Sequence, residues 1–278
     1  KGNGLIRFYK SDDYKTEYTL PFPSFGLTVN AILSAVSLGH KLILKNACQE
    51  PEIDNTIDML KNMGADVERL NATKIVIAHR GTKKLFGCNF CNMSDRNAAV
   101  TYAALAIATG SRLYIKNYDD IKMIAFYRFL DEIGAAWDCQ ENILTIHPTI
   151  NPLRSVRIKA FYYPNFHSDW QPLVSPILTQ ITGESVIEEH LFPNRLDLWS
   201  ELNRMGARFS FINNIKTRFI DDMPHAVKIY GPVKLHGAKV CANNLRSGAA
   251  LLIAAIAANG ETIIRKAEEI DRGYDSID

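Results

Sequence analysis

The run Ala-Ala-Val-Thr-Tyr-Ala-Ala-Leu-Ala-Ile-Ala-Thr at residues 98–109, followed by Gly-Ser-Arg-Leu-Tyr-Ile at 110–115, decides the fold. Its first part has the pattern of an apolar helix, and its last part that of a short strand. The same order of helix, glycine and strand recurs around Gly39, Gly183 and Gly260, so that successive glycines are 71, 73 and 77 residues apart. The sequence therefore predicts four copies of one α/β unit.

A second glycine follows in each of the first three copies, at Gly64, Gly134 and Gly206. Each ends an amphipathic helix pattern, and a glycine there suits a helix C-terminus that needs positive φ. Strand patterns come next, for example at residues 74–77 and 143–146. Each unit is therefore expected to run strand–helix–strand–helix–strand–strand.

The first helix of each unit is predicted to start at Ser24, Ser94, Ser168 or Asn244, which lie 15 or 16 residues before the unit's glycine. All four are good N-cap residues. If these helix ends face one cleft, their positive dipole ends form an anion site. The alternative is that the four residues only cap their helices.

The residues beside these caps differ between the units. Asp169 follows Ser168 and could act as a general base, and Arg246 follows the Asn244 cap and could hold a phosphate or carboxylate. Arg272 is predicted at the start of the second helix of the fourth unit. The alternative for each of these residues is a surface salt bridge.

Composition narrows the class of protein. Of the 278 residues, 47% are hydrophobic and 22% charged, which excludes a disordered or collagen-like chain. The net charge of +2 gives no electrostatic case for nucleic acid, and no apolar run is long enough for a membrane span. Five cysteines, an odd number, favour a reducing cytoplasm over a disulfide framework. Cys88 and Cys91 form a CxxC without a second ligand pair, so we expect no metal site.

Seven motifs carry a resemblance to a known family. In order they are Pro23-Ser24-Phe25-Gly26-Leu27-Thr28, Gln49-Glu50-Pro51-Glu52-Ile53, Met63-Gly64-Ala65, Phe166-His167-Ser168-Asp169-Trp170-Gln171, Phe192-Pro193-Asn194-Arg195, Asn244-Leu245-Arg246-Ser247 and Asp271-Arg272-Gly273-Tyr274. Their order and spacing resemble the enolpyruvyl transferase family, in the branch that acts on UDP-N-acetylglucosamine. The resemblance extends from about Tyr14 to Asp278.

The resemblance implies an α/β fold of two domains, each an inside-out α/β barrel of three βαβαββ units with the helices inside. Residues 1–93 would be the last unit of the first domain, and residues 94–278 the second domain with its last unit cut short. About four of six units would then be present. We therefore expect that these 278 residues alone do not turn over substrate, because the loop that bears the family's catalytic acid would lie in the units before them.

The resemblance also implies the reaction: transfer of enolpyruvyl from phosphoenolpyruvate to UDP-N-acetylglucosamine with release of phosphate. This is the first committed step of peptidoglycan precursor synthesis. It would occur in the cytoplasm, in a protein that is monomeric at full length, without cofactor, nucleic acid or membrane. Asp169 would take the proton of the sugar hydroxyl, while Arg246 and Arg272 would bind phosphoenolpyruvate.

Further residues are implied as substrate contacts. The predicted contacts of UDP-N-acetylglucosamine are Phe22, Pro23, Ser24, Phe25, Gly26, Ser168, Asp169 and Leu191. The predicted supporting residues are Glu50, Glu52, Asp95, Arg96, Asn194 and Arg195.

The chain departs from the family pattern at four positions, where Phe22 replaces a lysine, Gln49 an arginine, Pro193 a glutamate and Asn244 an aspartate. Two alternatives therefore stay open. One is a divergent or inactive paralogue that binds another nucleotide or nucleotide-sugar. The other is an α/β scaffold with a different ligand.

Overall fold

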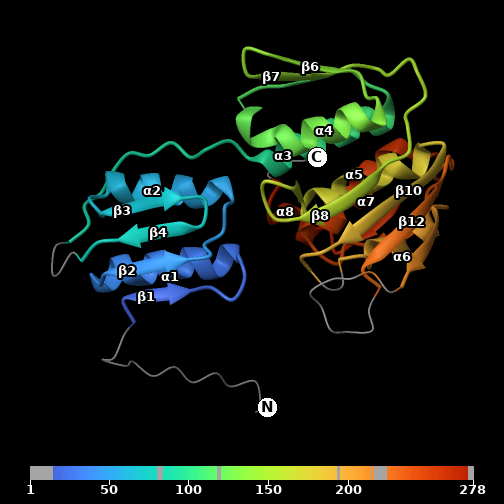
Figure 1. Ribbon diagram of the computed structural model, residues 1–278. Coiled ribbons are helices and arrows are strands. Elements are labelled where there is room, and N and C mark those ends of the chain that lie inside the picture. The colour runs from blue at the N-terminus through green and yellow to red at the C-terminus, as the bar shows by residue number, and fades with distance from the viewer. Residues whose placement is uncertain are drawn as a thin grey trace. The chain divides into compact units, whose positions relative to one another are not determined.

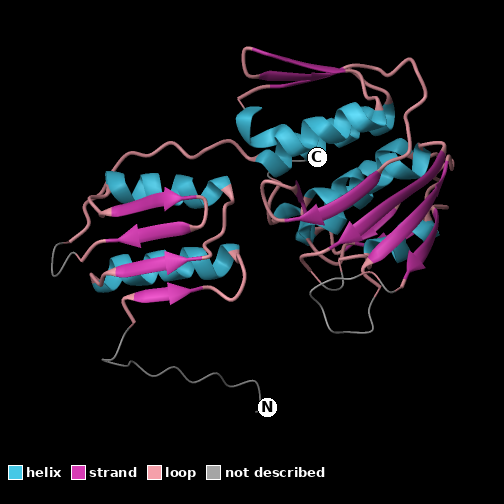
Figure 2. Ribbon diagram, viewed as in Figure 1, coloured by secondary structure: helices cyan, strands magenta, loops and turns pink. Residues whose placement is uncertain are grey.

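The computed structural model describes residues 15–79, 84–117, 120–192, 195–213, 215 and 224–274. The chain divides into two compact units, Lys1–Asn92 and Met93–Asp278, and each is described by itself. In both, short strands alternate with helices, so the predicted α/β class is confirmed (Figures 1 and 2).

The first unit follows the predicted order of strands and helices in full. Its four-stranded sheet has the order β1-β2-β4-β3, with β1 parallel to β2 and the other neighbours antiparallel. Ile32, Leu44, Ile53 and Ile75 are fully buried in its core. Its elements are β1 (Glu17–Thr19), α1 (Phe25–Leu38), β2 (Leu42–Lys45), α2 (Pro51–Asn62), β3 (Val67–Asn71) and β4 (Lys74–Ile77).

The second unit holds the other three copies of the repeat. Its strands form a three-stranded sheet β5-β7-β6, a five-stranded sheet β11-β12-β10-β8-β9 and the parallel pair β13-β14. The elements of its first copy are α3 (Arg96–Thr109), β5 (Leu113–Ile115), the 3-10 helix η1 (Asp120–Met123), α4 (Ile124–Ile133), β6 (Trp137–Gln140) and β7 (Ile143–Ile146). Those of the next are β8 (Arg157–Phe161), β9 (Phe166–His167), α5 (Trp170–Gln180), β10 (Gly183–Glu189), α6 (Leu198–Arg204), β11 (Arg208–Ile212) and β12 (Ala226–Gly231). The last copy has β13 (Lys239–Cys241), α7 (Leu245–Ala257), β14 (Ile263–Arg265) and α8 (Glu268–Asp271).

Helices α3, α5 and α7 pack against one another in the centre of this unit (Figure 1). Helix α5 is buried along nearly its whole length, including the polar side chains of Gln171, Ser175 and Thr179. The buried positions of α3 and α7 are largely alanines, for example Ala103 and Ala250. Small side chains let helix axes approach closely, so the alanine-rich runs of the sequence become an interior of three helices.

The copies share one pairing scheme. The strand after the central helix is parallel to the strand before it in the pairs β1-β2, β8-β10 and β13-β14. In the copy that starts with α3, β5 pairs only with β7, and no strand precedes α3 within residues 84–95. Here the predicted order lacks its first strand, because the residues before α3 form the connection from the first unit to the second.

The helix ends confirm the predicted C-terminal glycines and two of the four predicted N-caps. Gly39 and Gly110 are C-caps with φ of 70° and 66°, and the C-terminal glycines Gly64, Gly134 and Gly206 also have positive φ. The predicted N-caps Ser24 and Asn244 are confirmed.

Two predicted helix starts are wrong by one residue. Helix α3 is capped by Asp95 rather than Ser94, because the Asp95 carboxylate accepts hydrogen bonds from the backbone N–H groups of Asn97 and Ala98. Helix α5 is preceded by Asp169, whose side chain makes no capping bond, and Ser168 does not cap it either. The last copy of the repeat also differs from the prediction, because Arg272 directly follows the short helix α8 instead of starting a helix.

Candidate active site

Asp169 lies at the N-terminus of α5, between two arginines. Its Oδ1 is 3.0 Å from Nη2 of Arg195, and its Oδ2 accepts a hydrogen bond from Nε of Arg246 at 3.2 Å. The side chains of both arginines are largely buried, at 16% and 12% exposure, while that of Asp169 keeps 24%. One carboxylate therefore holds two guanidinium groups, and each guanidinium carries more N–H donors than this contact uses.

Arg246 is positioned by α7 and by a buried tyrosine. Asn244 and Ser247 form a capping box that fixes the first turn of α7, where Arg246 stands. Nη1 of Arg246 donates to the hydroxyl of Tyr274 at 3.1 Å, and this hydroxyl is 2.7 Å from Oγ1 of Thr101 in α3. The guanidinium is thus anchored to α3, α5 and the end of the described chain.

The electrostatics of the cluster favour its ionised form. Burial alone would raise the pKa of Asp169, but the charges of Arg195, His167 and Arg246 together lower it below its ordinary value. Burial alone would likewise lower the pKa of Arg246, and Asp169 and Tyr274 raise it instead. The pair is therefore ionised at neutral pH.

Ser168 and Leu191, both predicted substrate contacts, meet at a buried glutamate. Oγ of Ser168 donates to Oε2 of Glu189 at 2.7 Å, and the backbone N–H of Leu191 donates to Oε1 at 2.8 Å. Ser168 is fully buried, and Leu191 is partly exposed. The structure thus gathers Ser168, Asp169, Leu191, Arg195 and Arg246 at one end of the second unit.

Arg96 and Asp95 lie at the start of α3. The guanidinium of the buried Arg96 is 5.5 Å from the ring centres of both Tyr163 and Trp170. Nε1 of Trp170 in turn donates to Oδ1 of Asn97 at 3.0 Å. Arg96 therefore contributes to the packing between α3 and α5, and Asp95 is the exposed cap.

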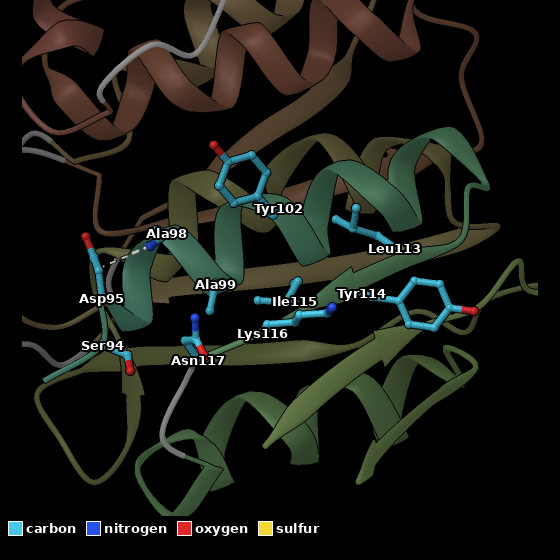
Figure 3. A pocket seen from close by; sticks show the side chains of 10 residues that line it. All are labelled: Ser94, Asp95, Ala98, Ala99, Tyr102, Leu113, Tyr114, Ile115, Lys116 and Asn117. Atoms are coloured by element: carbon cyan, nitrogen blue, oxygen red, sulfur yellow. Dashed lines mark hydrogen bonds between the residues drawn. The ribbon is translucent and has the colours of Figure 1, made fainter. Parts of the chain in front are cut away.

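A hollow of about 430 Å³ runs along β5 and the start of α3 (Figure 3). In the close-up, Asp95 and Ser94 stand at one end, and Tyr114 at the other. β5 is the outer strand of its sheet, whereas β2, β10 and β14 each have a parallel neighbour. The lining residues are Ser94, Asp95, Ala98, Ala99, Tyr102, Leu113, Tyr114, Ile115, Lys116 and Asn117.

The remaining predicted contacts lie in the first unit, around the N-terminus of α1. Ser24 caps this helix by accepting from the N–H of Leu27 at 3.3 Å. Phe22, Phe25 and Gly26 are exposed, and Pro23 is half-buried. At the start of α2, Glu50 is buried and Glu52 partly exposed. The helix start around Gly26 is thus open to a ligand.

Arg272, predicted to bind phosphoenolpyruvate, makes no contact with Asp169 among those that the structure shows for the described residues. The guanidinium of Arg272 pairs with Oε2 of Glu269 at 2.6 Å, and its side chain is 67% exposed. Its assignment to phosphoenolpyruvate stays a prediction. Asn194 lies outside the described residues.

Three residues of this cluster were not predicted from the sequence as site residues: Glu189, Tyr274 and Thr101. Tyr274 lies in the quoted Asp271-Arg272-Gly273-Tyr274 motif, and Glu189 ends an acidic pair after an apolar strand pattern. Neither signal predicts a partner, because the groups they contact are distant in the sequence.

The part of the chain that the structure describes shows neither a metal-ligand cluster nor a membrane-spanning helix. No group of three or more His, Cys, Asp or Glu side chains there could hold a metal ion. Cys88 and Cys91 are both exposed. None of the helices there combines the length and apolar character needed to cross a bilayer.

Known proteins match this chain over nearly its whole length. The family model of EPSP synthase (3-phosphoshikimate 1-carboxyvinyltransferase) matches residues 6–278. A UDP-N-acetylglucosamine 1-carboxyvinyltransferase of Kosmotoga olearia is 33% identical over 99% of this chain and 63% of its own length. The enzyme of the same name from the Wolbachia of Brugia malayi is 36% identical over 99% of this chain and 62% of its own.

Among solved structures, the enolpyruvyl transferase NikO from Streptomyces tendae has a TM-score of 0.74 at 24% identity, over 90% of this chain and 56% of NikO. That similarity concerns the fold, and it confirms the predicted enolpyruvyl transferase-like architecture. The chain spans about three fifths of the length of the curated relatives it matches. By the extent of the family match, the chain belongs to the EPSP synthase (3-phosphoshikimate 1-carboxyvinyltransferase) family of enolpyruvyl transferases.

Proposed function

We propose that the protein transfers the enolpyruvyl group of phosphoenolpyruvate to a sugar hydroxyl of UDP-N-acetylglucosamine and releases inorganic phosphate. The observation that carries this proposal is the ionised Asp169 carboxylate held between the guanidinium groups of Arg195 and Arg246. The names of the relatives from Kosmotoga olearia and Wolbachia support the choice of acceptor.

The arrangement suits a substrate that carries two anionic groups. Phosphoenolpyruvate has a carboxylate and a phosphate, and arginines bind both with paired N–H donors. Each arginine here uses only part of its donors on Asp169. A bound anion that shares these guanidinium groups neutralises part of their positive charge. The arginines then stabilise the Asp169 carboxylate less, and the pKa of its carboxyl rises.

Such a rise prepares Asp169 to act as a base. The proton of the sugar hydroxyl passes to an Asp169 oxygen while the hydroxyl oxygen bonds to C2 of phosphoenolpyruvate. The methylene carbon accepts a proton from an acid that we do not assign to any described residue. The tetrahedral adduct then eliminates phosphate: a base that we do not assign to any described residue takes a proton from the methyl carbon, the C2–C3 double bond re-forms, and the C–O bond to the phosphate breaks. Arg195 and Arg246 stabilise the charge of the leaving phosphate.

The first unit would contribute the nucleotide contacts. The open start of α1 around Phe22, Ser24 and Gly26 presents backbone N–H groups and a positive helix end, which suit a diphosphate. Phe22 adds no positive charge where the family has a lysine. The proposal includes the cellular role: peptidoglycan precursor synthesis in the cytoplasm, by a monomer that needs no cofactor.

A turnover and binding experiment tests this proposal. The protein expressed from its complete reading frame is incubated with both substrates, and phosphate and the carboxyvinyl product are measured. We expect both products from the wild type and strongly reduced amounts from Asp169→Asn. Binding of UDP-N-acetylglucosamine by calorimetry without any turnover would favour the nucleotide-sugar-binding paralogue. If neither substrate bound, the proposal would be rejected.

A further inference from the structure

Glu189 is a fully buried carboxylate with three hydrogen-bond donors. Its Oε2 accepts from Oγ of Ser168 at 2.7 Å, and its Oε1 accepts from the backbone N–H groups of Leu191 at 2.8 Å and Phe192 at 3.0 Å. The backbone of Glu189 is itself fixed in β10, because its N–H donates to the carbonyl of His225 at 2.7 Å. Both carboxylate oxygens are therefore committed to protein groups.

These donors belong to the two segments that carry the Asp169–Arg195 pair. Ser168 directly precedes Asp169 in the chain. On the other side, the guanidinium of Arg195 lies 4.5 Å from the ring centre of Phe192 and 3.0 Å from Asp169. The contacts thus form a closed circuit from Asp169 through Ser168, Glu189, Phe192 and Arg195 back to Asp169.

The preceding residue of the same strand provides a contrast. Glu188 is also nearly buried, but it pairs with Arg157 on β8 and with His190. Successive side chains of a strand point to opposite faces, so Glu188 points away from the circuit. The two glutamates are therefore neighbours in the sequence and similarly buried, but their carboxylates contact different groups.

We propose that Glu189 is a positioning residue for the proposed transfer reaction. By holding Ser168 and the Leu191–Phe192 backbone together, it sets the distance between the Asp169 carboxylate and the Arg195 guanidinium, and so their geometry toward the two substrates. Misplacement of reacting groups by about 1 Å costs on the order of 100-fold in rate. The inference rests on the proposed function for its substrates, but not for the circuit itself.

Stability alone does not account for a carboxylate at this position. Burial raises the pKa of Glu189, and the hydroxyl, the two backbone N–H groups and Arg195 offset this only in part. The ionised form is therefore less favourable in the fold than in water. A glutamine there would keep the shape and an acceptor for the two N–H groups without that cost. It would, however, place an NH2 group where Oε2 accepts from the Ser168 hydroxyl, so the hydrogen bond that ties Ser168 to Glu189 would be lost. We expect Glu189→Gln to leave thermal stability near that of the wild type while lowering catalysis.

The first experiment measures kcat and KM for both substrates in Glu189→Gln, Ser168→Ala and the double variant, with Glu188→Gln as the matched control. We expect each single change to lower kcat about tenfold, with the double variant no worse than either single one. Groups that act through one contact are non-additive in such a cycle. Glu188→Gln should stay within about twofold of the wild type and should combine additively with Ser168→Ala.

Two results would overturn the inference in an active protein. One is a Glu189→Gln variant with wild-type kcat. The other is multiplicative loss in the Ser168→Ala, Glu189→Gln double variant. If the wild type itself shows no turnover, the proposed function is wrong. The role of Glu189 in holding the two segments together is then tested by a measurement that needs no substrate.

Hydrogen exchange supplies that second measurement. The amides of Leu191 and Phe192 donate to Glu189, so Glu189→Ala should speed their exchange about tenfold, and Glu188→Ala should not. Ser168→Ala should also speed exchange at these two amides, although it changes a residue 21 positions away from Glu189. Unchanged exchange at Leu191 and Phe192 in Ser168→Ala would show that Glu189 does not couple the two segments.

Discussion

The first turns of α5 and α7 contact each other through Asp169 and Arg246, yet they use their N-terminal polar residues in opposite ways. At α7, Asn244 accepts from the N–H groups of Arg246 and Ser247, and the Ser247 hydroxyl accepts from the N–H of Asn244. At α5, Asp169 caps nothing and gives both carboxylate oxygens to arginines. The Asn244 side chain thus caps its own helix, whereas the Asp169 side chain bonds to residues outside its own helix.

The largest expected effect breaks this contrast at α5. Asp169→Asn keeps the size of the side chain and removes its charge, so the carboxylate that we propose as the acceptor of the sugar proton is lost. Removal of a general base lowers kcat by about 100-fold to 10,000-fold. Phosphate release measures the loss. Asp138→Asn is the control, because Asp138 pairs with His147 on the β6-β7 hairpin. Retained turnover in Asp169→Asn would remove Asp169 from the reaction.

A smaller effect is expected from Arg246→Lys. A lysine keeps the charge but cannot bond Asp169 and Tyr274 at once in the planar geometry of a guanidinium. Loss of one charge-assisted hydrogen bond of ~1.5 kcal/mol corresponds to about tenfold weaker binding. We therefore expect the KM for phosphoenolpyruvate to rise about tenfold. The control is Arg157→Lys, which changes an exposed arginine paired with Glu188. Equal KM values in the two variants would contradict a role for the Arg246 geometry.

The Asn244 cap of α7 predicts an effect on stability rather than on catalysis. Asn244→Ala removes the acceptor for two backbone N–H groups, and loss of such a cap costs ~1 kcal/mol of unfolding free energy. Ser24→Ala, which removes one longer bond of 3.3 Å at α1, should cost less, about 0.5 kcal/mol. Urea unfolding measures both. Unchanged stability in Asn244→Ala would contradict the capping role of Asn244.

The helix starts also show how far the sequence predicts the site. Ser24 and Asn244 were predictable as caps because capping depends on residues within one turn. The prediction that Ser94 caps α3 is wrong because the neighbouring Asp95 accepts both N–H groups. The prediction that Ser168 caps α5 is wrong because its hydroxyl donates to Glu189 instead. These residues are 21 positions apart, so no local sequence pattern indicates the contact.

The same distance limit separates the fold from the site. The repeat of helix, glycine and strand predicted the units because it is local and recurs. The Asp169–Arg246 contact joins residues 77 positions apart, and Thr101 meets Tyr274 across 173. Only the packing of α3, α5 and α7 brings these groups together. Asp169 and Arg246 could be singled out by residue type and by the family motifs, but their contact and Tyr274's part in it could not.

The smallest expected effect concerns acid stability and separates two carboxylates on either side of Ser168. The pKa of Asp169 is lowered in the fold, so its contribution to stability is present above its unfolded pKa of about 3.9 and is lost as pH falls through the folded value. The pKa of Glu189 is raised, so its contribution is present below its unfolded pKa of about 4.3 and is lost as pH rises through the folded value.

Single variants distinguish these two contributions in urea unfolding from pH 3 to pH 7. Below about pH 4, Asp169→Asn should lose less stability than the wild type as pH falls, because it lacks the carboxylate that must be protonated. Glu189→Gln should narrow its gap to the wild type, or gain on it, as pH rises, because it lacks the buried charge. If both variants followed the wild-type profile in parallel, neither carboxylate would titrate differently in the folded and unfolded states. The electrostatic contrast between Asp169 at the arginines and Glu189 in the interior would then be wrong.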